Sequence, residues 1–275
     1  MAVITMTREM GTLGKDVALG LAETMDLKIV HHELVEHDLA QRLGVQESAV
    51  HHYLEGAASV LERWKIDKQK LSRYTAQEIL EFARDGNIII RGWGATTLLR
   101  DVPNVVHIRV CAPMAFREGV MMARLGSTNA AAVRREIIRS DAAHSKVVQG
   151  AFGVAWENPL FYHAVFNTAH VPVETCVRAV RLLVDDPVFQ ETDATRAVLR
   201  DKLVEWKIRS ALAERYTAVA GVSGVDVAVK DRVVILSGTV KHQQHAKLVV
   251  QTVREVSGID EVESRIVILS GYTGL

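Results

Sequence analysis

The feature that most constrains the fold is an alternation, over the first 185 residues, of short β-branched runs with longer stretches of helical periodicity. Apolar strands that alternate with helices are typical of a parallel sheet with helices on both faces. We therefore predict an α/β fold for this part of the chain. Strands are expected at Val3–Met6, Asn87–Arg91, Val105–Val110 and Ala164–Asn167, and helices at Lys15–Met25, Glu33–Leu43, Ser72–Arg84, Met114–Leu125, Ala130–Val148 and Val173–Val184.

The pattern changes after an acidic stretch, residues 183–196, which contains Pro187 and is typical of a linker. Beyond it the order of elements is αββαβ, which predicts a small sheet with two helices on one face. We therefore predict domains at residues 1–185 and 195–275, joined by a linker at residues 186–194. The elements expected in the small α+β domain are Ala197–Arg215, Val225–Val229, Val233–Ser237, His242–Val256 and Glu263–Leu269.

A glycine loop, with the sequence TREMGTLGK at residues 7–15, follows the first predicted strand. Backbone amides at the start of a helix are unpaired, and the helix dipole favours an anion there. The phosphate-binding pattern G-x-x-x-x-G-K-[ST] is matched at Gly14 and Lys15, whereas Glu9 replaces its first glycine and Asp16 its hydroxyl residue. This partial match leaves two alternatives open, phosphate binding and an ordinary turn between a strand and a helix.

Composition and charge argue against several kinds of binding partner and site. Lysine plus arginine and aspartate plus glutamate both number 33, so no bulk charge indicates nucleic acid or an anionic membrane. No apolar run approaches the length of about 20 residues that spans a bilayer, and no signal-peptide pattern is present. The two cysteines and the histidines lack the spacing of a disulfide framework or a metal site. We expect a cytoplasmic protein without a metal site of its own, nucleic-acid partner or integral membrane association.

Several segments, which occur in the right order, resemble the cytidylate kinase-like family of relatives of the P-loop nucleoside monophosphate kinases. They are the glycine loop above, LKIVHHELVEHDLAQRLGVQESAVHHYLE, NIIIRGWGATTLLRDVPNVVHIRVCAPMAFR and WENPLFYHAVFNTAHVPVETCVRAV. The resemblance covers roughly residues 2–184. The segment VDVAVKDRVVILSGTVKHQQHAKLVVQTVREVSGIDEVESRIVIL resembles a BON domain, which would cover roughly residues 195–270.

The first resemblance implies transfer of a phosphoryl group from ATP to a nucleoside monophosphate such as CMP, with Mg²⁺ as the metal. This chemistry needs a phosphate cradle, a metal ion and cationic side chains around the transferring group. For Asp16, a favourable first-turn acid and a metal ligand both stay open. The residues placed at the donor nucleotide are Thr7, Arg8, Gly11, Thr12, Gly14, Lys15, Asp16 and Arg117. The implied catalytic residues are Lys15, Arg124, Arg139 and Asp141, of which the last three belong to a mobile lid that Arg117 and Arg124 begin.

Three positions depart from the family pattern. Trp93 stands where an arginine is common, His31 where an aspartate usually opens the monophosphate segment, and residues 142–146 lack the lid arginine that usually follows Asp141. Each such loss removes a charge worth about 2.7–4 kcal/mol of transition-state stabilisation. We expect Arg91, Trp93 and His31 to contact the acceptor, with Trp93 serving either as a core anchor or as a base-stacking platform.

Two functions therefore stay open on the sequence, which leaves catalytic activity undecided. The first is a nucleotide-binding protein that phosphorylates a CMP-like nucleoside monophosphate. The second is a catalytically degenerate sensor or scaffold, whose BON-like domain mediates protein or lipid interaction. Apolar residues along the helical region at residues 48–84 also suggest a symmetric homodimer.

Overall fold

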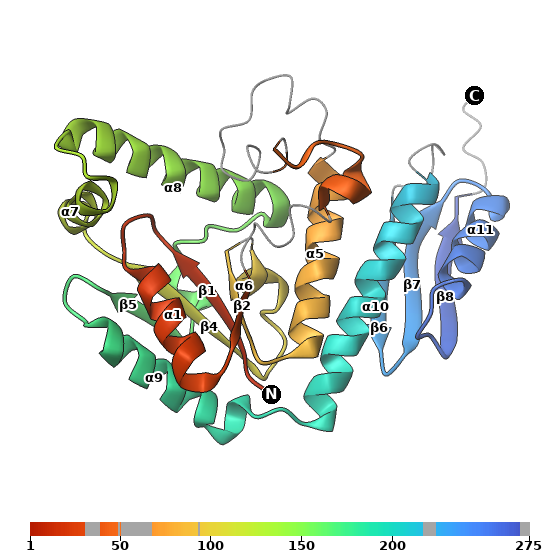
Figure 1. The fold of residues 1–275 in the computed structure, drawn as a ribbon. Coiled ribbons are helices and arrows are strands. Elements are labelled where there is room, and N and C mark those ends of the chain that lie inside the picture. The colour runs from red at the N-terminus through yellow and green to blue at the C-terminus, as the bar shows by residue number, and fades with distance from the viewer. Residues whose placement is uncertain (31–38, 49, 51–67, 93, 217–223, 270–275) are drawn as a thin grey trace. The chain divides into compact units, whose positions relative to one another are not determined.

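The computed structural model describes residues 1–30, 39–48, 50, 68–92, 94–216 and 224–269, and it contains two compact units, Met1–Thr192 and Asp193–Leu275 (Figure 1). The predicted domain limits, at residues 185 and 195, remain predictions. Residues 187–189 of the predicted linker form a short 3-10 turn, and a helix begins at Asp193. Along the described ranges, no helix combines the length and the apolar character needed to cross a membrane.

The first unit is built on a five-stranded parallel sheet with the strand order β2-β3-β1-β4-β5, which confirms the predicted α/β class (Figure 1). The central strand β1 lies between β3 and β4, so the loop that follows β1 emerges at the middle of the sheet. The elements are β1 (Val3–Arg8), α1 (Gly14–Met25), β2 (Lys28–Val30), α5 (Lys68–Asp85), β3 (Ile88–Arg91), α6 (Ala95–Leu98), β4 (Val105–Cys111), α7 (Met114–Leu125), α8 (Ala130–Phe152), β5 (Ala164–Asn167) and α9 (Val173–Asp185).

The first unit contains one strand that was not predicted, and two predicted features fall partly outside the described residues. The short strand β2 was not expected, because three residues are too few to show a periodicity. The predicted helix at residues 33–43 falls largely on residues 31–38, which lie outside the described residues. The apolar region proposed for a homodimer, residues 48–84, likewise includes the range 51–67, which is outside the described part.

The two faces of the sheet differ in chemistry. On one face, Ile4 and Met6 of β1 pack with α1 and α9 in a core that contains Val17, Leu21 and Val180. Because side chains alternate along a strand, Thr5 and Thr7 of β1 point to the opposite face, together with His107 and Arg109 of β4. The polar groups of the central strands are therefore collected on the face that α1 and α9 do not cover.

The second unit confirms the predicted αββαβ order. Its three-stranded sheet has the order β6-β7-β8, in which β6 and β7 are antiparallel and β7 and β8 are parallel. Residues from both helices and all three strands form its core, so both helices pack on one face of the sheet. The elements are α10 (Asp193–Tyr216), β6 (Val225–Lys230), β7 (Val233–Val240), α11 (Gln243–Arg254) and β8 (Glu261–Ile268).

A tight turn between β6 and β7 is stabilised by a buried carboxylate. Asp231 and Arg232 both adopt left-handed backbone conformations, with φ of 49° and 66°, as a two-residue hairpin turn requires. Asp201 of α10 accepts the N–H of Asp231 at 2.5 Å and that of Arg232 at 3.3 Å. The carboxylate of Asp201 thus holds two non-glycine residues in the left-handed conformations of this turn.

Candidate functional site

The loop after β1 has a backbone that leaves several amides without a protein acceptor. Leu13 precedes α1 in a left-handed conformation, with φ of 53°, and provides no side-chain cap. Within the described residues, the N–H groups of Leu13, Gly14 and Lys15 donate to no acceptor. An uncapped helix start of this kind is suited to an anion.

At both glycines of the loop, the neighbouring atoms leave no room for a side chain. Gly11 has φ of +80°, and a Cβ added to it would lie 2.7 Å from the carbonyl oxygen of Arg117. A Cβ on Gly14 would lie 2.8 Å from the Cβ of Arg8. The loop therefore lies tightly between β1 and the first turn of α7, and larger residues would displace its backbone.

Lys15 is exposed in the first turn of α1, and within the described chain it forms no ion pair. A cation at this end of a helix opposes the dipole. The lysine thus adds a charge next to the bare amides, and the described part of the chain supplies no counterion for it.

Thr7 and Thr12, both predicted at the donor nucleotide, form hydrogen bonds with other parts of the protein. The hydroxyl of Thr12 donates to the carbonyl oxygen of Glu9 at 2.8 Å, and the carbonyl of Thr12 accepts a hydrogen bond of 2.8 Å from Thr168. Thr7 is buried at the end of β1, where its hydroxyl lies 3.5 Å from that of Thr96. Both hydroxyls are thus engaged with protein groups.

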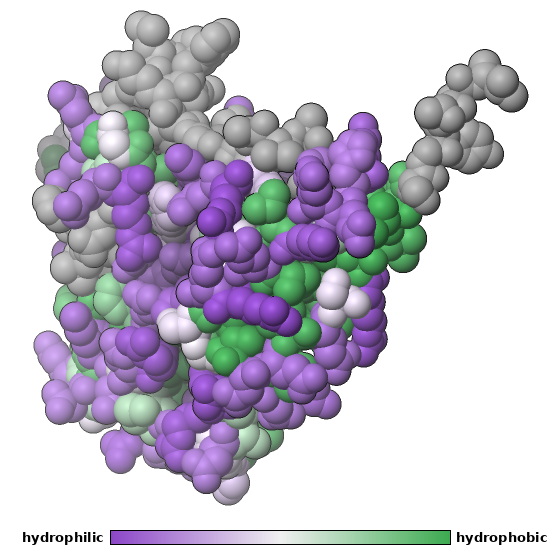
Figure 2. Space-filling model, turned by 90° about the vertical axis from the view of Figure 1, so that its right-hand side faces the viewer, coloured by the Kyte–Doolittle hydropathy of each residue, from purple (hydrophilic) through white to green (hydrophobic). Residues whose placement is uncertain are grey.

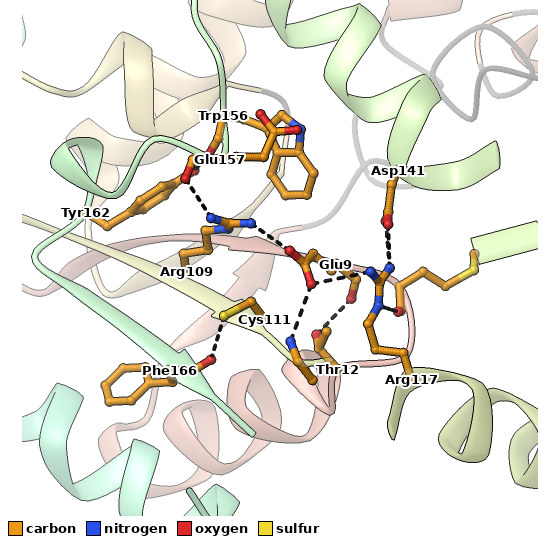
Figure 3. A network of polar contacts seen from close by, with 12 residues as sticks. Glu9, Thr12, Arg109, Cys111, Arg117, Asp141, Trp156, Glu157, Tyr162 and Phe166 are labelled. Carbon is orange, nitrogen blue, oxygen red and sulfur yellow. Dashed lines mark hydrogen bonds and ion pairs between the residues drawn. The ribbon is translucent and has the colours of Figure 1, made fainter. Parts of the chain in front are cut away.

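Glu9, which replaces the first glycine of the motif, is the centre of a polar network (Figure 3). Its carboxylate lies 2.6 Å from Arg109 of β4 and 3.4 Å from Arg117 of α7. Arg109 also donates to the carbonyl of Glu157 at 2.7 Å and lies 5.1 Å from the ring centroid of Trp156. This network attaches the start of the loop to β4 and α7.

Arg117, predicted at the donor nucleotide, is nearly buried, with 5% of its surface exposed. Its Nε donates to the carbonyl of Met10 at 2.7 Å, and its Nη2 contacts both oxygens of Asp141 on α8, at 2.6 and 2.8 Å (Figure 3). The structure therefore brings together two predicted site residues, Arg117 and Asp141, as a pair that supports the loop from two helices.

Two further predicted residues meet on the other side of the loop. Arg124, at the end of α7, forms an ion pair of 2.7 Å with Asp16 of α1, and both side chains are partly exposed. Arg139 instead pairs with its neighbour Glu136 at 2.8 Å on the exposed surface of α8. Arg124 is therefore linked to the loop region through Asp16, and Asp141 through Arg117. Arg139, the third residue predicted in the lid, pairs only within its own helix in the described chain.

The residues expected to contact the acceptor are only partly described. Arg91 is half-buried at the end of β3 and is followed by Gly92, which has φ of +83°. Trp93 and His31 lie outside the described residues. Arg91 lies beside Met6 of β1, and the contact with the acceptor that was proposed for all three residues stays a prediction.

The sequence motifs did not reveal Arg109, the buried His107 or the partly buried His144 as members of this region. Arg109 and His107 alternate with apolar residues in VVHIRV, and a charged residue within such a strand is the signal that could have revealed them. Burial, together with the nearby Arg8 and Arg109, lowers the pKa of His144 to about 4. The pKa of His107 is lowered to about 3 by burial and by the neighbouring His163.

The buried His107 makes the stability of the first unit sensitive to acid. Its Nδ1 lies 2.7 Å from the hydroxyl of Thr5. Because its pKa is about 3 in the folded protein and near 6.5 in the unfolded chain, the unfolded state binds more protons between these values. Stability is therefore expected to fall as the pH drops from 6.5 towards 4, by up to about 1.4 kcal/mol per pH unit for this group.

Urea unfolding at several pH values, followed by circular dichroism, measures this slope. We expect His107→Gln to flatten it and the exposed control His170→Gln to leave it unchanged. An equal slope in the wild type and His107→Gln would show that this histidine is not responsible.

A parallel sheet whose central strand leads through a glycine loop into an uncapped helix is typical of α/β proteins that bind phosphate groups. The chain matches the cytidylate kinase-like family over residues 3–170 and the BON domain over residues 200–270. It therefore belongs to the cytidylate kinase-like family and carries a BON domain after the kinase-like domain, as the sequence predicted.

Several solved structures are similar to this chain. A crystal structure of an uncharacterized protein from Eubacterium ventriosum has 17% sequence identity and a TM-score of 0.54, covering 68% of this chain and 99% of the other. The shikimate kinase from Acinetobacter baumannii has 11% identity and a TM-score of 0.39, with coverage of 67% and 93%. The YorR protein from Bacillus subtilis, in complex with phosphorylated GDP, has 10% identity and a TM-score of 0.42, with coverage of 70% and 100%. No curated protein matches the sequence.

Proposed function

We propose that the kinase-like domain binds ATP at residues 7–15 and transfers a phosphoryl group to a nucleoside monophosphate, with a CMP-like acceptor. The observation that carries the proposal is the combination of unpaired amides at residues 13–15 with an exposed Lys15 that has no counterion in the described chain. A polyphosphate supplies both missing partners, because its oxygens accept from the amides and neutralise the lysine. Membership of the cytidylate kinase-like family supports a nucleotide as the source of that polyphosphate.

The residues of the loop then have distinct roles. Lys15 and the amides contact the donor phosphates, whereas Thr12, Glu9 and Arg117 hold the backbone in the shape that presents them. Arg124 at the end of α7 lies beside Asp16 in the first turn of α1, next to the loop.

The donor set fits Mg²⁺ only as an ion carried by the nucleotide. No group of three or more candidate metal ligands occurs among the described residues, whereas Mg²⁺ is commonly held by phosphates, water and one or two carboxylates. Asp16 is the carboxylate that would hold it from the protein side, after release from Arg124. When bound, Mg²⁺ would neutralise charge on the phosphates.

A second candidate function, nucleotide binding without turnover, is favoured by a different observation. Arg117 and Asp141 neutralise each other, and Arg139 is paired with Glu136. These three residues are therefore engaged in protein contacts instead of facing a ligand. In this alternative the kinase-like domain is a sensor or scaffold, and the BON domain mediates protein or lipid interaction.

Calorimetric titration with ATP and Mg²⁺ and a coupled kinase assay with CMP, UMP and dCMP separate the two functions. Replacing Lys15 by alanine is expected to weaken ATP binding at least about tenfold, because a charged phosphate contact is worth about 1.5–3 kcal/mol. Gly11→Ala is expected to weaken binding as well, because its Cβ would displace the loop from the Arg117 carbonyl. The matched control is Gly119→Ala on α7, where an added Cβ meets nothing within 4 Å.

Each outcome has a defined meaning. Turnover that is lost in Lys15→Ala supports the kinase function, and ATP binding without turnover supports the sensor. If ATP does not bind, or binds Lys15→Ala as tightly as the wild type, both proposals are wrong.

A further inference from the structure

The strand β8 lies at the edge of the BON-domain sheet and pairs on one side only, with β7. The register places Val240 beside Ile268, and the N–H of Leu269 donates to the carbonyl of Val240 at 2.9 Å. Because hydrogen-bonding groups alternate along a parallel strand, the backbone groups of the even-numbered residues point away from β7. These residues are Val262, Ser264, Ile266 and Ile268, and within the described chain their outward groups have no partner.

At the opposite edge of the same sheet, formed by β6, a side chain covers an outward backbone group. Val227 of β6 directs its carbonyl away from β7, and Arg209 of α10 donates to that oxygen at 2.8 Å. A charged side chain thus covers this edge, which is one way in which proteins prevent strand addition. Across the described residues of β8, no side chain covers the edge in this way.

The side chains of β8 are self-complementary in one register. If two β8 strands meet antiparallel with Ser264 opposite itself, Glu263 of each copy faces Arg265 of the other. In the same register Val262 faces Ile266, on the face of the sheet that the helices cover. Shifting the twofold axis by one residue in either direction would instead put Glu263 against Glu263 or Arg265 against Arg265, which is unfavourable.

The end of the strand adds apolar surface to this edge. Val267 and Leu269 are 58% and 59% exposed, and Ile268 and Leu248 of α11 are also exposed. Figure 2 shows a hydrophobic area on this side of the molecule. In the register above, Leu269 would lie opposite Ile259 of the second copy, so association would cover part of this surface.

We infer that β8 pairs with β8 of a second copy of this chain, antiparallel and with Ser264 opposite itself, to give a homodimer with a continuous sheet. In this arrangement the outward backbone groups of Val262, Ser264 and Ile266 find partners. Glu263 and Arg265, which pair with each other at 2.8 Å within one strand, also face the Arg265 and Glu263 of the other copy across the axis. A strand edge alone is a small interface, so we expect weak, concentration-dependent association.

Sedimentation velocity of the full chain over a range of concentrations tests this inference. Glu263→Arg and Arg265→Glu alone should each weaken the dimer about tenfold, because two cross-strand ion pairs become like-charge pairs worth up to about 1 kcal/mol each. The double variant E263R/R265E should restore the wild-type dimer, because the pair is only reversed. The matched controls are Asp226→Arg and Lys230→Glu on β6, which lie at the covered edge of the same sheet.

A cross-link provides an independent measurement. Opposite residues of a hydrogen-bonded antiparallel pair have Cα atoms about 5.5 Å apart, which suits a disulfide. Ser264→Cys should therefore form a disulfide-linked dimer under mild oxidation, whereas Ser237→Cys on the central strand β7 should not. A monomer at all concentrations, a dimer that the single charge changes leave intact, or a double variant that does not recover would each overturn the proposed pairing.

Discussion

Replacing Arg117 by alanine is expected to reduce the free energy of unfolding of the kinase-like domain by about 1.5–3 kcal/mol, because it removes a buried guanidinium and its charge-assisted hydrogen bonds. Arg117 is 5% exposed and contacts two separate segments, the loop at residues 9–10 and the helix α8. It holds the carbonyl of Met10 in the loop, the carboxylate of Glu9 at the end of β1, and Asp141 on α8. Removing it would free the loop on one side and leave Asp141 without its cationic partner.

The same variant should also weaken ATP binding, because the loop would no longer be held in place. Denaturant unfolding and calorimetric titration measure the two effects. Arg117→Lys keeps the charge, but an ammonium group lacks the planar guanidinium that contacts Met10 and Asp141 at the same time. This variant should therefore recover only part of the stability. Arg139→Ala is the matched control, since its exposed pair with Glu136 is worth at most about 1 kcal/mol. A loss of similar size in Arg117→Ala and Arg139→Ala would contradict the role assigned to Arg117.

Replacing Gly238 by alanine is expected to unfold or severely loosen the BON domain. Gly238 of β7 has φ of +114°, and an added Cβ would lie 1.8 Å from the carbonyl oxygen of Gly224. Backbone strain costs about 1–3 kcal/mol, and forcing atoms into occupied space costs about 1–3 kcal/mol more. We therefore expect a loss of about 2–6 kcal/mol, which is a large fraction of the stability of a small domain.

Hydrogen exchange measured by mass spectrometry on the full chain locates this effect. Peptides that cover β6, β7 and β8 should exchange faster in Gly238→Ala, whereas peptides from the kinase-like domain should not change. Gly224→Ala is the matched control at the same contact, because its added Cβ would lie 3.6 Å from its nearest neighbour. Unchanged exchange in β7 of Gly238→Ala would show that the backbone can relax around the new methyl group.

The elements whose signals are local were predicted from the sequence. The helix Met114–Leu125 and the strand Ala164–Asn167 have the predicted bounds. For the helix this is because Pro113 precedes it and Gly126 ends it in a left-handed conformation. The αββαβ order was predicted for the same reason, since each of its elements has its own periodicity.

The network around the loop could not be predicted in this way. Glu9 lies about one hundred residues before Arg109 and Arg117 in the sequence, and 24 residues separate Arg117 from Asp141. In the sequence, Glu9 was noticed only because it replaces the first glycine of the phosphate-binding pattern. Its role follows from the sheet order, which places β4 beside β1 and brings Arg109 next to the end of β1.

The sequence by itself determined the family and the strands and helices that are long enough to show a periodicity, because these depend on neighbouring residues along the chain. The tertiary structure decided which charges are available to a ligand. Lys15 has no counterion in the described chain, while Arg117 and Asp141 are paired with each other. The physical reason is that a charge is neutralised by whatever group the fold brings within a few ångströms, and that distance is not encoded in local periodicity.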